Sequence, residues 1–324
     1  MAHFTCLAAA RHAVLRDAGW DVEVQGLQGA PELRVIAGAQ AHVTVEVACR
    51  LLGLGAGRVR SVQADDQGRM LVEPLRAELA RYEGPTIVCA QAGEINTGAF
   101  DPIDEIVDLC RAHGAWCHVD GAFGLWAAAS PRRRQLLEGF ERADSWATDG
   151  HKWLNVPYDS GIAAVADPSA HRAAMTSTSA YIPPHEEDIP WGFDWTPEFS
   201  RRARGVPVYA ALRSLGRGGV AELVDRCCDH AQRMAARLAD ADGVEVLNDV
   251  VLNQVLVRFD DDDALTNAVI EAVQRDGTCW LSGSSFRGRD VMRISVVGWQ
   301  TTAEDADRSV EAILAAALSA RATA

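Results

Sequence analysis

The sequence predicts an α/β protein with a mostly parallel sheet flanked by helices, followed by a small α+β region. Up to about residue 165, short apolar runs alternate with helical patterns, which is typical of parallel βαβ units. Beyond about residue 206 this strict alternation stops. A chain of 324 residues can hold one large and one smaller core. We therefore expect a large domain over residues 1–205 and a small C-terminal domain over residues 206–324.

The first region begins with a helix that runs to about Ala18 and is ended by Gly19. We expect strands at residues 22–24, 34–36, 58–62, 86–90, 116–119, 145–148 and 161–165. We expect helices at residues 43–52, 73–81 and 103–112. The glycine-rich run 53–57 follows a helix and not a strand, so we interpret it as a helix end and turn and not as a nucleotide-binding loop.

Residues 175–197 show no periodicity and contain four of the twelve prolines. A loop of this length is usually functional or disordered, and we expect a lid or a contact with a second subunit. After it, we expect helices at residues 208–215, 220–238, 264–276 and 303–318, and strands at residues 244–247, 255–259 and 292–297.

Charge and cysteine content narrow the function class. The formal net charge of -14 argues against a nucleic-acid partner, and we place the Arg132–Arg134 triplet on a surface turn. The eight cysteines form no C-x-x-C pair, so we expect reduced cysteines in a cytoplasmic protein, without a disulfide framework or a metal site. Neither terminal apolar stretch is long enough to span a membrane.

Lys152 is the only lysine among 31 basic residues. Arginine stays protonated near neutral pH, whereas a lysine amine can be tuned to lose its proton and to form a Schiff base with a carbonyl. On position alone, a lysine on a surface loop is an equally good interpretation.

Asp120 and Lys152 follow two expected strands, 116–119 and 145–148. Because carboxyl ends of parallel strands share one edge of a sheet, both side chains can reach the same site. A lysine and a carboxylate suit pyridoxal phosphate, whose aldehyde binds the amine and whose ring nitrogen pairs with the acid. Alone, a carboxylate at this position is more often a helix N-cap.

Four motifs occur in order along the chain. They are Gln40-Ala41-His42, Asn96-Thr97-Gly98-Ala99-Phe100-Asp101-Pro102, His118-Val119-Asp120-Gly121-Ala122-Phe123-Gly124, and Asp144-Ser145 through His151-Lys152-Trp153. Together they resemble the group II pyridoxal-phosphate decarboxylases, a family of fold type I with a large domain like that of aspartate aminotransferase. The resemblance covers nearly the whole chain.

The resemblance implies roles for individual residues. Lys152 would be the Schiff-base lysine, Asp120 would pair with the pyridine nitrogen, and His42 would stack on one face of the ring. Ala122 would pack on the other face, and His151 would lie beside the phosphate. Without the resemblance, His42 is better interpreted as an ordinary surface or core histidine.

Tyr181 lies 29 positions after Lys152 in the long loop. The resemblance implies that it donates a proton to the carbanion left after carbon dioxide departs, usually in the neighbouring subunit's site. The alternative is an exposed loop aromatic. The resemblance also implies that Arg293 can lie near a substrate carboxylate, although an arginine on a strand more often makes a structural ion pair.

The chain departs from the family pattern in two places. Glu94-Ile95 replaces a Thr-Thr pair, and whether Asn96 or Thr97 supplies the missing hydroxyl is open. Asp149 stands where animal members often have Asn near the phosphate. A carboxylate there would repel the phosphate unless it is turned away, and Thr148 could act as the donor instead.

In the family, a Gly- and Ser/Thr-rich segment that binds the phosphate precedes the helix that here begins at Met1. We therefore expect the large domain to lack its N-terminal part. The resemblance implies a homodimer that decarboxylates an L-amino acid. The alternatives are a pyridoxal-phosphate aminotransferase or other lyase of this fold, and a truncated, catalytically impaired fragment.

Overall fold

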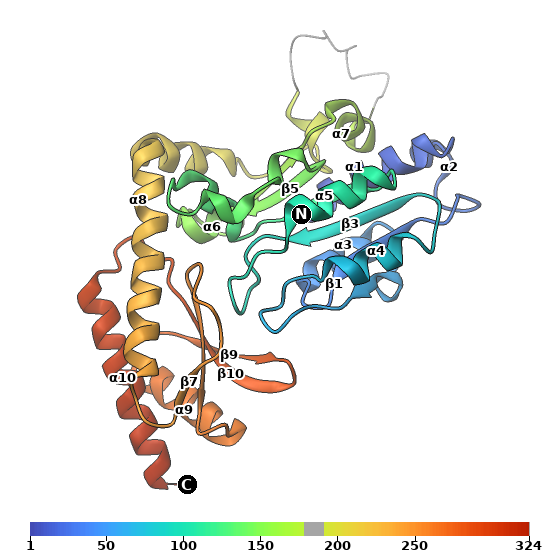
Figure 1. The fold of residues 1–324 in the computed structure, drawn as a ribbon. Helices are drawn as coiled ribbons and strands as arrows, with labels where there is room; N and C mark the ends of the chain where they lie inside the picture. The colour runs from blue at the N-terminus through green and yellow to red at the C-terminus, as the bar shows by residue number, and fades with distance from the viewer. Residues whose placement is uncertain (178–190, 324) are drawn as a thin grey trace.

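The larger of two sheets has six strands, and the computed structural model describes the chain over residues 1–177 and 191–323 (Figure 1). Its strand order is β2-β1-β3-β4-β5-β6, and all neighbours are parallel except β5 and β6. The strands are β1 (Arg34–Gly38), β2 (Arg60–Val62), β3 (Thr86–Gln91), β4 (Trp116–Asp120), β5 (Ser145–Asp149) and β6 (Gly161–Val165). The predicted mostly parallel sheet is confirmed.

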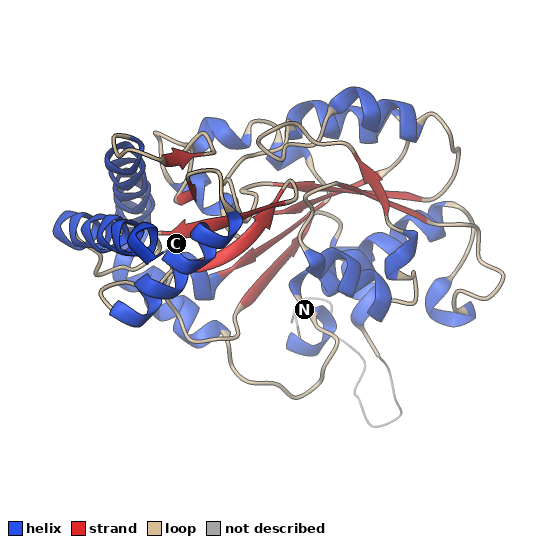
Figure 2. Cartoon of the chain, turned by 90° about the horizontal axis from the view of Figure 1, so that it is seen from below, coloured by secondary structure: helices blue, strands red, loops and turns tan. Residues whose placement is uncertain are grey.

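Both faces of this sheet are covered by helices (Figure 2). Alternate residues of a strand point to opposite faces, and accordingly Val35 and Ile87 belong to one buried cluster while Ile36 and Val88 belong to another. The first cluster includes residues of α1 (Ala2–Asp17), α3 (Val43–Leu51) and α7 (Pro168–Met175). The second includes residues of α4 (Val72–Leu79), α5 (Ile103–Ala112) and α8 (Gly205–Ala239).

Local sequence explains where several helices begin and end. In α5, Ile103, Ile106, Val107 and Cys110 are buried, a spacing that places them on one helical face. The helix α9 (Asp263–Asp276) begins where the Asp262 side chain accepts a hydrogen bond from the Leu265 amide. It ends at Gly277, which has the left-handed conformation of a helix C-cap.

The second sheet is antiparallel, with the order β7-β8-β10-β9. Its strands are β7 (Val244–Val246), β8 (Gln254–Phe259), β9 (Ser282–Phe286) and β10 (Arg289–Ser295), and α8, α9 and α10 (Ala303–Thr323) pack with it. Gly216 interrupts α8 with φ 63° and ψ 178°. The two helices predicted at residues 208–215 and 220–238 are therefore the two arms of one kinked helix. The predicted domain boundary near residue 206 stays a prediction.

Three local predictions were wrong or incomplete. Residues 22–24 are not a strand but part of α2 (Val22–Gln25), because Asp21 caps a helical turn by accepting from the Val24 amide. The short helix α7 and the polar strand β9 were not predicted, since neither carries a clear apolar period. The segment 178–190 lies outside the described residues. A turn of 3₁₀ helix, Gly192–Trp195, follows it.

Arg133 corrects the interpretation of the arginine triplet as a solvated surface turn. Its side chain is buried, and it contacts two carboxylates of α8, with N–O distances of 3.1 Å to Asp225 and 3.0 Å to Asp229. Arg132 is exposed and binds Asp229 as well. Arg132 and Arg133 therefore connect the segment after β4 to α8.

The cysteines are all free, and seven of the eight are buried. Within residues 1–177 and 191–323, no helix combines the length and the apolar character needed to cross a membrane.

Candidate active site

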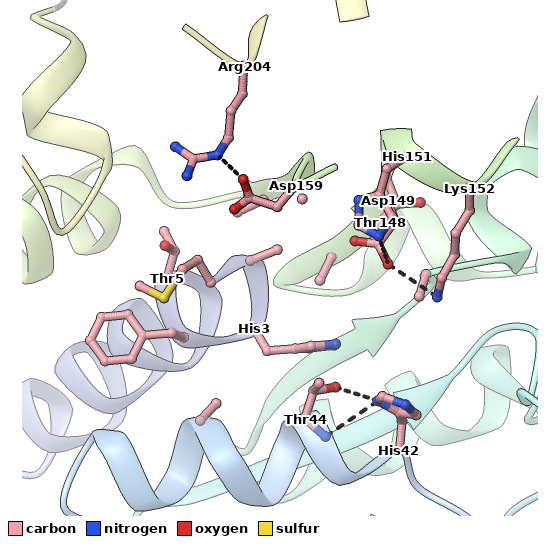
Figure 3. Close-up of a pocket in the computed structure, with 18 of the residues that line it drawn as sticks. His3, Thr5, His42, Thr44, Thr148, Asp149, His151, Lys152, Asp159 and Arg204 are labelled. Atoms are coloured by element: carbon pink, nitrogen blue, oxygen red, sulfur yellow. Dashed lines mark hydrogen bonds and ion pairs between the residues drawn. The ribbon is translucent and has the colours of Figure 1, made fainter. Parts of the chain in front are cut away.

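A cavity of about 840 Å³ lies at the carboxyl ends of the parallel strands. Its wall is formed by the first turn of α1, the start of α3, the segments after β4 and β5, and part of β10 (Figure 3). This volume falls within the range of about 300–1,000 Å³ that is usual for small-molecule sites. The position agrees with the general rule for ligands of parallel α/β sheets.

Lys152 lies in the short helix α6 (Gly150–Trp153), directly after β5, and lines this cavity. Its Nζ lies 3.1 Å from Asp149 Oδ2 and 4.0 Å from the centre of the Phe123 ring. The ammonium group is thus held between a carboxylate and an aromatic face. The side chain remains 21% exposed, so a small molecule in the cavity can reach the amine.

Asp120 is the last residue of β4 and is almost completely buried. Its Oδ1 accepts a hydrogen bond of 3.1 Å from the Ala122 amide, and its Oδ2 lies 3.4 Å from His3 Nε2. Burial by itself would raise the pKa of Asp120, but the contacts with His3 and with the Ala122 amide outweigh it and hold the pKa far below its ordinary value. The carboxylate is therefore ionised at neutral pH.

His42 is the N-cap of α3 and lines the cavity. Its Nδ1 accepts from the Thr44 amide at 3.4 Å and lies 2.7 Å from the Thr44 hydroxyl (Figure 3). These contacts fix the ring at the start of the helix. Burial lowers the pKa of His42, and the nearby Lys152 and His3 act in the same direction. The imidazole is thus neutral at neutral pH.

Ala122, Thr148 and His151 also line the cavity. The His151 ring lies 4.1 Å from the Tyr158 ring, and its Nδ1 lies 3.1 Å from the Ser160 amide. The hydroxyl oxygen of Thr148 is buried and has no hydrogen-bond partner within residues 1–177 and 191–323. A buried polar atom without a partner is costly, so this hydroxyl is available to a ligand in the cavity.

Thr97 is placed elsewhere by the structure. It is fully buried, does not line the cavity, and its hydroxyl contacts the Gln67 carbonyl at 2.7 Å and Glu94 Oε2 at 3.1 Å. Glu94 accepts from the Thr97 and Asn96 amides and thereby holds the turn after β3. Of the two residues that replace the family's Thr-Thr pair, only Ile95 reaches the cavity. The prediction that Thr97 contacts the cofactor thus has no geometric support.

No sequence pattern pointed to His3, which lies in the first turn of α1 and reaches Asp120. No motif includes it, and a histidine near the start of a helix has no distinctive spacing. Arg293 of β10 lines the cavity on another side, and its buried Nε has no partner in the described part of the chain. Tyr181 lies outside the described residues, so the structure does not place it.

The cavity thus presents an amine, a neutral imidazole and a hydroxyl without a partner among the described residues, and the ionised carboxylate of Asp120 contacts two residues of the cavity wall, Ala122 and His3. These groups can hold an aromatic molecule that carries a carbonyl group and a cationic ring nitrogen. Against known families, the sequence model of the pyridoxal-dependent decarboxylase conserved domain matches residues 1–260. The chain belongs to this family.

The names of the relatives of this chain refer to different amino-acid substrates. The acidic amino acid decarboxylase GADL1 of Mus musculus is 32% identical over 235 residues, which cover 70% of the chain and 43% of that protein. The aromatic-L-amino-acid decarboxylase of Bacillus atrophaeus is 27% identical over 320 residues, which cover 94% of the chain and 64% of that protein. The chain therefore spans about half to two thirds of the length of these relatives.

The fold of the decarboxylase-family chain is also found in solved structures. The crystal structure of Oryza sativa TDC with PLP and tryptamine superposes with a TM-score of 0.89 at 26% identity, covering 98% of this chain and 68% of that one. The predicted fold class and family are thus confirmed.

Proposed function

We propose that this chain catalyses the pyridoxal-phosphate-dependent decarboxylation of an L-amino acid to an amine and carbon dioxide. One observation carries the proposal. The sequence has one lysine, and its amine lines a cavity at the ends of β4 and β5, where β4 ends in the ionised carboxylate of Asp120. Family membership supports it, and the two relatives described above are named as amino-acid decarboxylases.

The residues around the cavity fit pyridoxal phosphate. Lys152 would hold the aldehyde carbon, Asp120 would pair with the ring nitrogen, and His42 and Ala122 would contact the ring. The unpaired Thr148 hydroxyl and His151 would serve the phosphate. Asp149 is compatible with this anion, because its carboxylate is directed to Lys152.

When bound, the cofactor supplies an electron sink for the carbon that loses its carboxylate. Asp120 keeps a negative charge at the end of β4. Because the carboxylate is buried, where the dielectric constant is low, its attraction for a cationic ring nitrogen is stronger than in water. Asp149 Oδ2 holds the Lys152 ammonium in an ion pair while the amine is not bound to the cofactor. His42 presents an uncharged ring, since its pKa is lowered. Proton donation by Tyr181 remains part of the proposal.

Arg293 is the group we propose for the substrate carboxylate. Its Nη2 donates to Ser282 Oγ at 3.3 Å, and within the described residues it makes no ion pair. Burial lowers the pKa of this guanidinium, so a carboxylate partner would offset the cost of burying its charge. An Arg293→Met variant should raise KM with little change in kcat if this contact only binds substrate.

The test of the function uses Lys152 and a panel of acidic and aromatic L-amino acids. Purified chain with pyridoxal phosphate should show the visible absorbance of lysine-bound cofactor, and borohydride reduction should fix the cofactor's mass on Lys152. Substrate should yield carbon dioxide and amine. Lys152→Arg keeps the charge but should show neither absorbance nor product. A keto acid product would favour an aminotransferase, and absence of cofactor uptake would favour an impaired fragment.

A homodimer and a cytoplasmic location complete the proposal. Three large apolar residues, Val206, Tyr209 and Leu212, are exposed along the first arm of α8. Their spacing of three places them close together on the helix, and such exposed apolar patches often mark interfaces. Analytical ultracentrifugation should find twice the mass of one chain, and Tyr209→Asp should shift the equilibrium towards monomers.

A further inference from the structure

The carboxylate of Asp120 stands at the end of a hydrogen-bonded chain of four other side chains. Trp116 Nε1 lies 2.9 Å from Ser145 Oγ, and His118 Nδ1 lies 2.9 Å from the same oxygen. His118 Nε2 lies 2.9 Å from His3 Nδ1, and His3 Nε2 lies 3.4 Å from Asp120 Oδ2. His118 and Ser145 are completely buried, so solvent does not provide alternative partners for them.

The direction of this chain follows from its two ends. The ionised Asp120 carboxylate can only accept, so a proton of His3 lies on Nε2, facing Asp120. An indole nitrogen can only donate, so Trp116 donates to Ser145 Oγ. A neutral His3 then accepts at Nδ1 from His118 Nε2, and the neutral His118 accepts at Nδ1 from the Ser145 hydroxyl.

We propose that His3 is a positioning residue that, held in this tautomer by His118, Ser145 and Trp116, keeps the Asp120 carboxylate ionised and oriented for a cationic ring nitrogen. The inference rests on the proposed function, since it concerns the carboxylate that would face the cofactor. It goes beyond that function because no motif assigns His3 a role.

The energetic reason is the burial of Asp120. A carboxylate that is 4% exposed loses most of its hydration, which favours the protonated form unless charged or hydrogen-bonding groups compensate. Among the residues that the structure describes, the Ala122 amide and His3 are the groups that contact its two oxygens directly. Without His3, one oxygen loses its charge-assisted partner, and Asp120 would take up a proton at a higher pH.

Other titratable groups act on the same region from neighbouring elements. His42 precedes α3, Cys89 lies on β3, and Asp101 precedes α5. Burial raises the pKa of the Cys89 thiol and lowers the pKa of His42, so both are neutral near pH 7. Burial raises the pKa of Asp101 to about 7. Each variant must therefore be compared with the wild type at the same pH, so that these three groups influence both proteins equally.

The experiment uses two substitutions and a control on the same helix. His3→Phe keeps a planar ring and removes both hydrogen bonds, whereas His3→Gln places an amide donor near the position of Nε2. His12→Phe makes the same change in a histidine that binds Glu23, far from the cavity residues. Melting temperatures of the three variants report any purely structural effect.

The first measurement needs no cofactor. The side-chain carboxyl carbon of Asp120 is followed by NMR in aspartate-labelled protein, with Asp120→Asn to identify its signal. We expect an ionised carboxylate from pH 8 to pH 5 in the wild type and in His12→Phe. In His3→Phe the signal should titrate at a clearly higher pH, and His3→Gln should restore most of the wild-type behaviour.

The second measurement is the dissociation constant of pyridoxal phosphate. We expect His3→Phe to bind about tenfold more weakly at pH 7.5, which equals about 1.4 kcal/mol. The ratio to wild type should grow as the pH falls towards 5.5, because protonated Asp120 cannot pair with a cationic nitrogen. His3→Gln should lie close to wild type.

Each outcome decides one claim. The role of His3 is overturned if His3→Phe leaves the Asp120 titration unchanged and binds pyridoxal phosphate as tightly as the wild type at every pH. This holds even if the melting temperature of the variant falls. Wild-type protein that takes up no pyridoxal phosphate overturns the proposed function alone, because the cofactor-free titration still decides whether His3 controls Asp120.

Discussion

Lys152 Nζ and Asp149 Oδ2 lie 3.1 Å apart, so the one lysine of the chain carries its counter-ion within the same turn. Both side chains line the cavity and are about one fifth exposed. The pair explains how a carboxylate can occupy a cofactor cavity, since it is directed to an ammonium group. It also makes the reactivity of the lysine depend on Asp149.

Asp149→Asn should speed the reaction of Lys152 with aldehydes. A partly exposed ion pair contributes about 0.2–1 kcal/mol, so losing it should raise the rate by a factor of about 1.4 to 5. Stopped-flow absorbance with pyridoxal, which lacks the phosphate, isolates this effect. The rate with pyridoxal phosphate should rise by a larger factor, because the substitution also removes the repulsion between the Asp149 carboxylate and the phosphate. Asp149→Glu is the control, and a slower reaction of the Asn variant with both aldehydes would contradict the prediction.

Asp101→Asn should destabilise the fold by about 1–3 kcal/mol. Asp101 Oδ1 accepts from the Met70 amide and Oδ2 from the Gln91 amide, both at 2.7 Å, and an amide nitrogen cannot replace one of these acceptors. Urea unfolding at pH 7 measures the loss. A stability equal to wild type would show that the two contacts contribute nothing.

The same residue predicts a pH dependence with a defined sign. Burial raises the pKa of Asp101 from 3.8 to about 7, so the native state binds this proton more tightly than the unfolded chain does. Its contribution to stability is complete below about pH 4 and is lost as the pH rises to about 7. The deficit of Asp101→Asn relative to wild type should therefore shrink between pH 5 and pH 8. A deficit that grows over this range would contradict the assignment.

Arg133→Ala should cost about 2 kcal/mol of unfolding free energy. Removing one partner of a fully buried ion pair costs about 3–5 kcal/mol, and we expect less here because Asp229 is partly exposed. Arg132→Ala is the matched control, since Arg132 binds the same Asp229 from an exposed position and should cost clearly less unfolding free energy. If urea unfolding shows the same loss of unfolding free energy in both variants, the buried contacts of Arg133 contribute no more than the exposed contacts of Arg132.

Gly216→Ala should destabilise the protein by about 1–2 kcal/mol. The backbone of Gly216 has a positive φ of 63° within α8, a conformation that residues with a Cβ adopt only with strain. Gly218 lies in the second arm of the same helix without a positive φ, and its Cβ position is open, so Gly218→Ala should stabilise by about 0.5–1 kcal/mol. Thermal unfolding that shifts both variants in the same direction would contradict the interpretation of the kink.

Much of the fold could be read from local patterns. Alternating apolar runs and helices predicted the parallel sheet, because burial on both faces requires them. Where the pattern was weak, prediction failed. The polar strand β9 forms because it pairs with β10. Residues 22–24 form part of a helix because the Asp21 side chain caps its first turn. Tyr181 and the domain boundary remain predictions.

By itself, the sequence determined the chemistry that the chain can offer. A single lysine, an aspartate at a strand end and four ordered motifs identified the family, since residue type and order along the chain carry that information. Only the tertiary structure decided which groups act on one another. It joined His3 to Asp120, turned Asp149 to Lys152 and left Thr97 outside the cavity. The physical reason is that hydrogen bonding and burial depend on distances between segments far apart in the chain, as with His3 and His118.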